Sequence, residues 1–174
     1  MATPKSLMVL LLALACHTAF AQDNKAHYGS LGLGILMPQG KYKNNWKNGF
    51  HADFTVNAQL SKKLWFTAEF PFESVSADSS GKKSIGMLGA APGLKFFPVN
   101  FLYIKASAGI HLNYVNNLYS GFATGYLSGG AGLWFTKDVG VFFDYNLWKA
   151  AQGGPYKRFE EYMNLGVMFG FGKK

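Results

Sequence analysis

Residues 50–60 alternate strictly between apolar and polar side chains, and this alternation restricts the possible fold more than any other feature of the sequence. One face of the segment carries Phe50, Ala52, Phe54, Val56, Ala58 and Leu60, and the other carries His51, Asp53, Thr55, Asn57 and Gln59. A helix cannot give this pattern, because its apolar stripe recurs every three or four residues, whereas the side chains of a strand point alternately to two faces. The segment is therefore predicted to be a β-strand with two unlike faces.

The same alternation recurs in seven other segments. It is clear in residues 28–37, 64–73, 102–114, 139–148 and 162–171. It is weaker in residues 85–97, which contain Ala90-Ala91-Pro92-Gly93, and in the glycine-rich residues 124–135. Because proline cannot donate a ladder hydrogen bond, we expect a bulge or an irregular strand end at residues 90–93. The chain thus has eight predicted strands.

The connections between these segments alternate in length. Residues 61–63, 98–100 and 136–138 are short connections, whereas residues 38–49, 74–84, 115–123 and 149–161 are longer. An even number of strands with this alternation is typical of an outer-membrane barrel, in which the tight turns and both termini face the periplasm. Segments of about 10 residues also suffice to cross the hydrocarbon layer when tilted. The predicted fold class is all-β, a closed eight-stranded antiparallel up-and-down transmembrane β-barrel.

The strands of a soluble β-sandwich also alternate, so the composition of the two faces must distinguish a sandwich from a membrane barrel. The polar face of a sandwich meets water and is expected to be rich in Lys, Glu and Gln. Here that face consists mainly of Gly, Ser, Thr, Asn and Trp, and only 15% of the chain is charged. Aromatic residues predicted near the strand ends form two girdles of the kind found at bilayer interfaces. They are Phe50, Phe72, Tyr114 and Tyr126 toward the longer connections and Phe66, Phe96, Phe135 and Phe171 toward the short turns. The barrel is preferred.

The first 21 residues are predicted to be a signal peptide. Lys5 precedes an apolar stretch from Leu7 to Ala15, and Ala19-Phe20-Ala21 forms an A-x-A cleavage site. Lipidation of Cys16 is the weaker alternative, because Ala13-Leu14-Ala15 has Ala where a lipoprotein signal has a large aliphatic residue. The remaining residues 22–174 are predicted to form a single outer-membrane β-barrel domain. That domain has no cysteine, which excludes a disulfide scaffold.

The eight alternating segments, together with residues 141–145 (VFFDY) and 164–171 (NLGVMFGF), resemble the small eight-stranded outer-membrane β-barrel family that includes OmpX and the OmpA transmembrane domain. The resemblance covers residues 26–172 and implies the barrel fold, an outer-membrane location and insertion by the outer-membrane assembly machinery. Family members often end on a terminal Phe, whereas Gly172-Lys173-Lys174 follow Phe171 here. The resemblance does not specify a function.

An eight-stranded barrel leaves an interior just wide enough for side chains to fill. The inward positions are predicted to form a polar plug, in which charges must pair because burying a lone charge costs several kcal/mol. The predicted plug residues are Asp53, Glu69, Glu73, Lys95, Lys105, His111 and Asp144. Glu69, Lys95 and Lys105 are expected to form a salt-bridge network, with Asp53 or Asp144 joining it. A narrow channel is the third-ranked alternative.

Catalysis has weak support in the sequence. Some eight-stranded barrels are lipid A acyltransferases or deacylases that combine His with Ser and an acid, so a lipid A-modifying enzyme is the runner-up function. The candidates for it are His51, Glu73, Ser74, Ser76 and Asp78. The four histidines show no metal-ligand spacing, and no cofactor is expected. We therefore predict a non-enzymatic protein.

The longer connections carry basic and aromatic residues that are predicted to lie at the outer rim. They are Lys41, Tyr42, Lys43, Trp46, Lys47, Lys82, Lys83, Lys157 and Arg158. Basic side chains there suit the phosphates and acidic sugars of lipopolysaccharide, although solvated loop charges would look the same. Outer-membrane lipid and lipopolysaccharide are the expected partners, nucleic acid is not, and the protein is predicted to be a monomer. The predicted role is envelope integrity, adhesion or another surface interaction.

Overall fold

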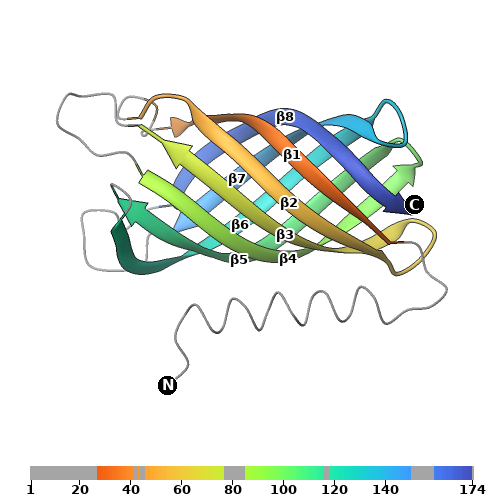
Figure 1. The fold of residues 1–174 in the computed structure, drawn as a ribbon, viewed down its shortest axis with the longest axis horizontal. Helices are drawn as coiled ribbons and strands as arrows, with labels where there is room; N and C mark the ends of the chain where they lie inside the picture. Colours follow the sequence, from red (N-terminus) through yellow and green to blue (C-terminus); the bar gives the residue numbers. More distant parts are fainter. Residues whose placement is uncertain are drawn as a thin grey trace, which may run out of the picture.

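The structure is a computed structural model that describes residues 27–40, 43, 46–76, 85–115, 118–149 and 159–173. These residues form eight antiparallel strands that close into one barrel, with β1 paired to both β2 and β8 (Figure 1). The strands are β1 (His27–Pro38), β2 (Gly49–Gln59), β3 (Leu64–Val75), β4 (Ile85–Val99), β5 (Leu102–Val115), β6 (Leu118–Trp134), β7 (Val139–Lys149) and β8 (Phe159–Lys173). Every strand pairs with its neighbours in the sequence, so the predicted closed up-and-down barrel is confirmed.

The pairing register fixes the shape of the barrel. Following paired residues once around, from Tyr28 through Asn57, Thr67, Gly93, Ser107, Ser128, Asn146 and Tyr162, returns to β1 at Pro38, ten residues further on. With a rise of about 3.3 Å per residue and about 4.8 Å between strands, this stagger corresponds to a strand tilt of about 40°. Such a narrow, strongly tilted barrel brings residues distant in sequence to the same depth of its interior.

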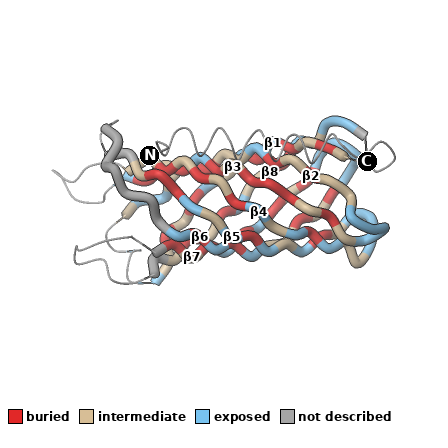
Figure 2. The backbone as a smooth tube through the Cα atoms, turned by 90° about the horizontal axis from the view of Figure 1, so that it is seen from below, coloured by how far each residue is buried: buried red, intermediate tan, exposed pale blue. Residues whose placement is uncertain are grey.

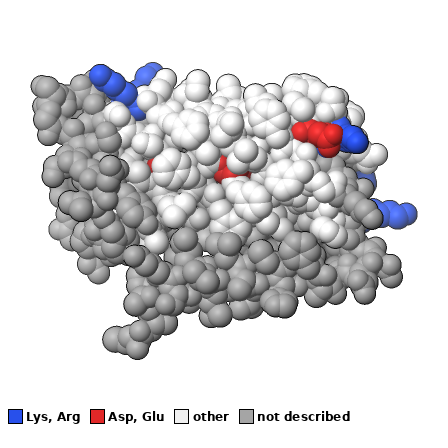
Figure 3. Space-filling view, in the orientation of Figure 1, with Lys and Arg blue, Asp and Glu red and all other residues white. Residues whose placement is uncertain are grey.

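The two faces of the strands differ as the alternation predicts. Burial alternates along each strand (Figure 2), and the outward positions are apolar. Among the described residues, twenty-two large hydrophobic side chains are more than a third exposed, including Leu33, Ile104 and Leu165. The face shown in Figure 3 is almost free of charge between the two ends of the barrel, where Lys and Arg gather. A soluble monomer does not expose so continuous an apolar surface, because water would drive it to associate. In the part of the chain described, no helix is long and apolar enough to cross a membrane.

Three local predictions are wrong. The pairing of β4 with β5 has the same register on both sides of Pro92, and its irregularity lies between Phe96 and Val99 instead. Pro92 is an exposed outward residue, so the strand continues through it without a bulge. The connection predicted at residues 115–123 is not a long loop, because β6 begins at Leu118 and pairs with Val115.

The third correction concerns the aromatic girdle near the longer connections. Tyr126 is buried inside the barrel, where its hydroxyl donates to Asn146 Oδ1 at 2.8 Å. It has the same parity as the buried Ser128, whereas the neighbouring Leu127 points outward. Phe50 and Phe72 are exposed on the outer face as expected, and so are Phe96, Phe135 and Phe171 near the short turns. The side chain of Tyr114 lies outside the described residues.

Candidate functional site: the barrel interior

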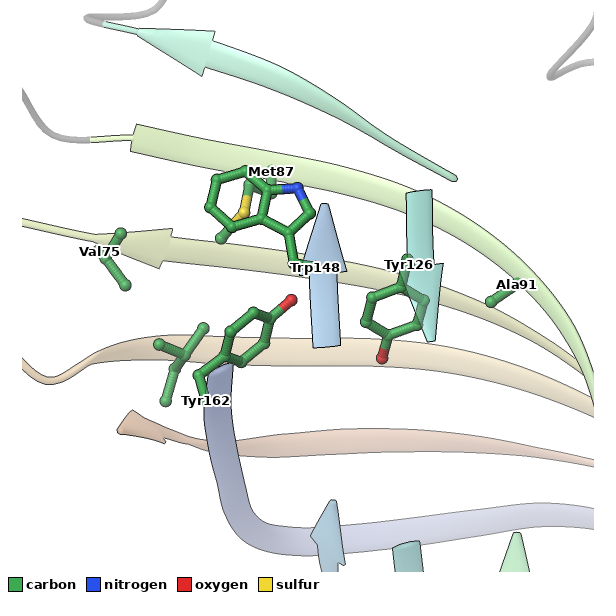
Figure 4. Close-up of a cluster of buried hydrophobic side chains, with 7 residues drawn as sticks. Val75, Met87, Ala91, Tyr126, Trp148 and Tyr162 are labelled. Carbon is green, nitrogen blue, oxygen red and sulfur yellow. The ribbon is translucent and has the colours of Figure 1, made fainter. Parts of the chain in front are cut away.

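The interior is built in layers, with polar residues between two apolar clusters. The cluster at the end of the short turns contains Tyr28, Trp65, Tyr103, Trp134, Phe142 and Met168. The cluster at the end of the longer connections contains Leu36, Val75, Met87, Ala91, Tyr126, Trp148 and Tyr162 (Figure 4). The buried polar side chains come from all eight strands. The sequence predicts the polar residues, but not that apolar clusters flank them on both sides.

Lys105 is the centre of one part of the polar layer. Its Nζ lies 3.0 Å from Glu69 Oε1 and 2.9 Å from Asp144 Oδ2, and all three side chains are almost fully buried. The hydroxyl of Ser107 donates to the other oxygen of Glu69 at 3.0 Å. The structure thus brings together three strands, β3, β5 and β7, through one ammonium group and two carboxylates. This is the predicted arrangement of Glu69, Lys105 and Asp144.

Lys95 does not join this network as predicted. Among the described residues, the ion pair of Glu69 is with Lys105, and Lys95 Nζ lies 5.0 Å from the centre of the Tyr103 ring instead. Lys95 and Lys105 are direct cross-strand partners. Because like charges placed opposite each other are destabilising, the buried Lys95 is directed to the aromatic face of the turn-end cluster, where a cation is attracted by the ring.

A second polar group surrounds Glu73, which is fully buried. Its Oε1 lies 3.0 Å from His51 Nδ1 and accepts a hydrogen bond from Asn164 Nδ2 at 3.0 Å. Its Oε2 accepts a 2.7 Å hydrogen bond from the Tyr162 hydroxyl and lies 4.0 Å from His111 Nδ1. Alternation could place Asn164 on the inward face, but it could not show that β8 brings Asn164 and Tyr162 to a carboxylate on β3.

Asp53 extends the group around Glu73 through His51. His51 Nε2 lies 3.5 Å from Asp53 Oδ1, and the hydroxyl of Thr55 donates to Asp53 Oδ2 at 2.6 Å. Gly32 on the neighbouring strand makes this position possible, because a Cβ at Gly32 would overlap the Asp53 carboxylate. All seven predicted plug residues therefore lie at inward positions within one polar layer or at its edge.

The residues considered for lipid A chemistry do not converge. His51 and Glu73 are buried inside, whereas Ser74 has the opposite parity and faces outward. Ser76 is exposed beyond the end of β3, and Asp78 lies outside the described residues. A serine on the far side of the barrel wall is out of hydrogen-bond reach of a buried histidine. Within the described ranges, no group of three or more His, Cys, Asp and Glu is arranged to hold a metal ion.

The rim at the longer connections is described only in part. Lys43 and Lys47 are exposed, and Trp46 packs against the loop-end cluster. The other predicted rim residues lie outside the described residues: Lys41, Tyr42, Lys82, Lys83, Lys157 and Arg158. On the outer face of β7 and β8, the Tyr145 hydroxyl donates to Glu161 Oε2 at 2.7 Å.

The architecture defined by these strands is that of the small eight-stranded outer-membrane β-barrels. The attachment invasion locus protein Ail of Yersinia pestis, solved in complex with the heparin analogue sucrose octasulfate, has a TM-score of 0.58 and 11% identity, covering 84% of this chain and 99% of Ail. Neisserial surface protein A has a TM-score of 0.57 and 12% identity, covering 83% of this chain and 97% of its own. A scan of family models finds no match to the sequence, and neither does a search of curated proteins. At these identities the likeness shows the fold.

Proposed function

We propose that the chain is an outer-membrane protein with a closed interior, exported by its first 21 residues, and that it acts at the cell surface without catalysing a reaction. The observation that carries this proposal is the combination of an apolar outer face with a layered interior. The apolar face suits acyl chains, in which the closed sheet leaves no unpaired backbone edge. Because the two apolar clusters and the ion pairs between them fill the interior, we expect no continuous water-filled path through the barrel.

The closed interior is tested by conductance in planar bilayers. We expect no stepwise openings from the refolded protein. Lys105→Met should remain non-conducting as well, because the clusters around Trp134 and Trp148 close both ends of the polar layer independently of Lys105. Regular channel steps from the native protein, or a marked increase in solute leakage for Lys105→Met, would instead support the narrow channel.

The location is tested by separating the two membranes of expressing cells on a density gradient and following the protein and its N-terminus. Mature protein starting at Gln22 in the outer-membrane fraction is expected. Recovery in the soluble fraction would contradict the proposal.

The surface role rests on the basic connections at one end. Residues 39–48, 76–84 and 150–158 contain seven Lys and Arg and one Asp, a balance that favours the phosphates of lipopolysaccharide. Replacing Lys43 and Lys47 by Glu should weaken binding to supported bilayers of phosphorylated lipid A and leave binding to dephosphorylated lipid A unchanged. Equal loss on both surfaces would contradict a phosphate contact.

Mass spectrometry of lipid A from cells with and without the protein tests the enzyme alternative, and an unchanged acylation pattern is expected.

A further inference from the structure

The loop end of the interior contains a cavity that the proposed surface role does not use. The volume of this cavity is ≈ 20 Å³, and its lining includes Leu36, Trp46, Val75, Ile85, Met87 and Trp148. A water molecule needs two or more polar partners, whereas this lining is mostly apolar: besides these residues it contains Pro38, Glu161 and Tyr162, and the Tyr162 hydroxyl is bonded to Glu73 and Glu161 Oε2 to Tyr145. The cavity therefore favours an apolar group of about the size of a chain terminus.

Among the described residues, paired strands surround the cavity and Trp46 borders it on the loop side. Around it, the barrel wall is closed by paired residues, including Leu36 with Gly49, Val75 with Ile85 and Pro38 with Tyr162. Below it, Tyr162 donates its hydroxyl to Glu73 and so joins the cavity floor to the polar layer. On the loop side, Trp46 lines the cavity, and the Lys47 amide donates to the Ser76 carbonyl at 2.9 Å, which ties the β1–β2 connection to the end of β3. An acyl chain of a bilayer lipid would have to pass through a hydrogen-bonded sheet, whereas a molecule dissolved in water would approach from the loop side, at Trp46.

The charged residues near the cavity indicate which polar headgroup such a molecule would carry. Lys43 and Lys47 are exposed on the same connection as Trp46, and the connections at this end are strongly basic in sequence. Glu161 is the acidic residue that borders the cavity, but its carboxylate accepts from Tyr145 on the outward face. We propose that the outer mouth of the barrel binds a free, single-chain anionic amphiphile of the fatty-acid class, with its chain end in the cavity under Trp46 and its carboxylate beside the lysines of the first connection.

The four tryptophans of the chain provide the readout, because Trp46 and Trp148 lie at the cavity and Trp65 and Trp134 lie in the cluster at the opposite end. The protein is placed in nanodiscs and titrated with 12-bromododecanoate, whose terminal bromine quenches a tryptophan that it touches. In a W46F/W65F/W134F variant, the remaining Trp148 should be quenched to saturation. In a W46F/W65F/W148F variant, the remaining Trp134 should not respond. Equal responses, or no saturable quenching of Trp148, would overturn the proposal.

Two adjacent substitutions provide the matched control. Val75→Phe fills the cavity and should weaken the apparent affinity about tenfold, because the chain end loses its apolar site. Ser74→Phe adds the same ring on the outward face and should have no effect. Retained binding in Val75→Phe would overturn the proposal. If Val75→Phe does not fold, as judged by heat-dependent migration in gels, Trp46→Ala replaces it, and the same loss is expected from removing the cover of the cavity.

The source and the charge of the ligand are tested in parallel. Nanodiscs made with a brominated phosphatidylcholine should give quenching that Val75→Phe does not change, since that lipid stays outside the wall. Quenching by this lipid that Val75→Phe abolishes would show that bilayer lipid is the occupant and overturn the free amphiphile. A bromododecyl-trimethylammonium probe should bind at least about tenfold more weakly than the carboxylate, and equal binding would contradict the role of the lysines. Because folding is checked separately, failure of these experiments leaves the closed-barrel proposal standing.

Discussion

At the residue scale, the interior depends on partners for its buried charged groups. Lys105 is shared by Glu69 and Asp144, and the Glu73 carboxylate is surrounded by His51, Asn164 and Tyr162. The charged side chains could be predicted as inward from alternation alone. The partners of Glu73 could not, since its hydrogen-bond partners lie up to 91 positions away in the sequence.

Replacing Lys105 by Met should destabilise the protein by about 3–5 kcal/mol, because Glu69 and Asp144 would be left as buried carboxylates without a cation. The midpoint of urea unfolding in detergent micelles measures this change. Lys137→Met is the control: its pair with Asp138 is 3.9 Å long and 86% of the Lys137 side chain is exposed, so an effect near zero is expected. Similar losses of stability in the two variants would show that the buried ion pairs stabilise the barrel no more than the exposed pair does.

Gly130 and Gly129 give a second matched pair. A Cβ at Gly130 would overlap the Asp144 carboxylate and would lie 2.5 Å from the Phe143 carbonyl oxygen, so Gly130→Ala should cost about 1–3 kcal/mol through displacement of Asp144 from Lys105. At Gly129 the nearest atom is 3.9 Å away, and Gly129→Ala should change stability by less than about 0.5 kcal/mol. The same unfolding measurement compares the two, and an unchanged midpoint for Gly130→Ala would contradict the close packing of Asp144.

At the scale of the strand, alternation was sufficient to assign both faces of the six segments in which it is clear, because the period of two is local and needs no knowledge of the neighbours. Alternation failed where the pairing with a neighbouring strand determines the local structure. The pairing of β4 with β5 continues through Pro92 without a change of register. Strand β6 begins before its recognisable alternation and pairs with β5 there. Tyr126 was assigned to a girdle from its residue type, although its parity with Ser128 already indicated the interior.

Arginine at two leucines of equal exposure tests whether these outward faces meet lipid. Leu33 and Leu60 are each 40% exposed, but Leu33 lies in the middle of β1 and Leu60 lies in the turn after β2. Leu33→Arg should destabilise the folded barrel in lipid vesicles by about 2–4 kcal/mol, and Leu60→Arg by about 0–1 kcal/mol. The comparison is made by denaturant titration in vesicles. Equal and small effects would indicate that both faces meet water.

At the scale of the whole molecule, the stagger of ten residues determines which side chains share a depth. It brings Tyr28, Trp65, Tyr103 and Trp134 together at one end, and Leu36, Met87, Trp148 and Tyr162 at the other. Neither cluster can be derived from single-strand patterns, because the stagger belongs to the closed sheet. The inward residues, polar and aromatic alike, were therefore predictable as a list, and their grouping into layers along the barrel axis was not.

The central claim is that the apolar residues outside the wall touch acyl chains and those inside do not. It is tested most directly by nuclear Overhauser effects between lipid acyl protons and leucine methyl groups in nanodiscs. Leu33 and Leu165 should show strong contacts with the acyl chains, and Leu36, which is 1% exposed, should show none. Contacts at Leu36, or their absence at Leu33 and Leu165, would contradict a closed and filled barrel in a membrane.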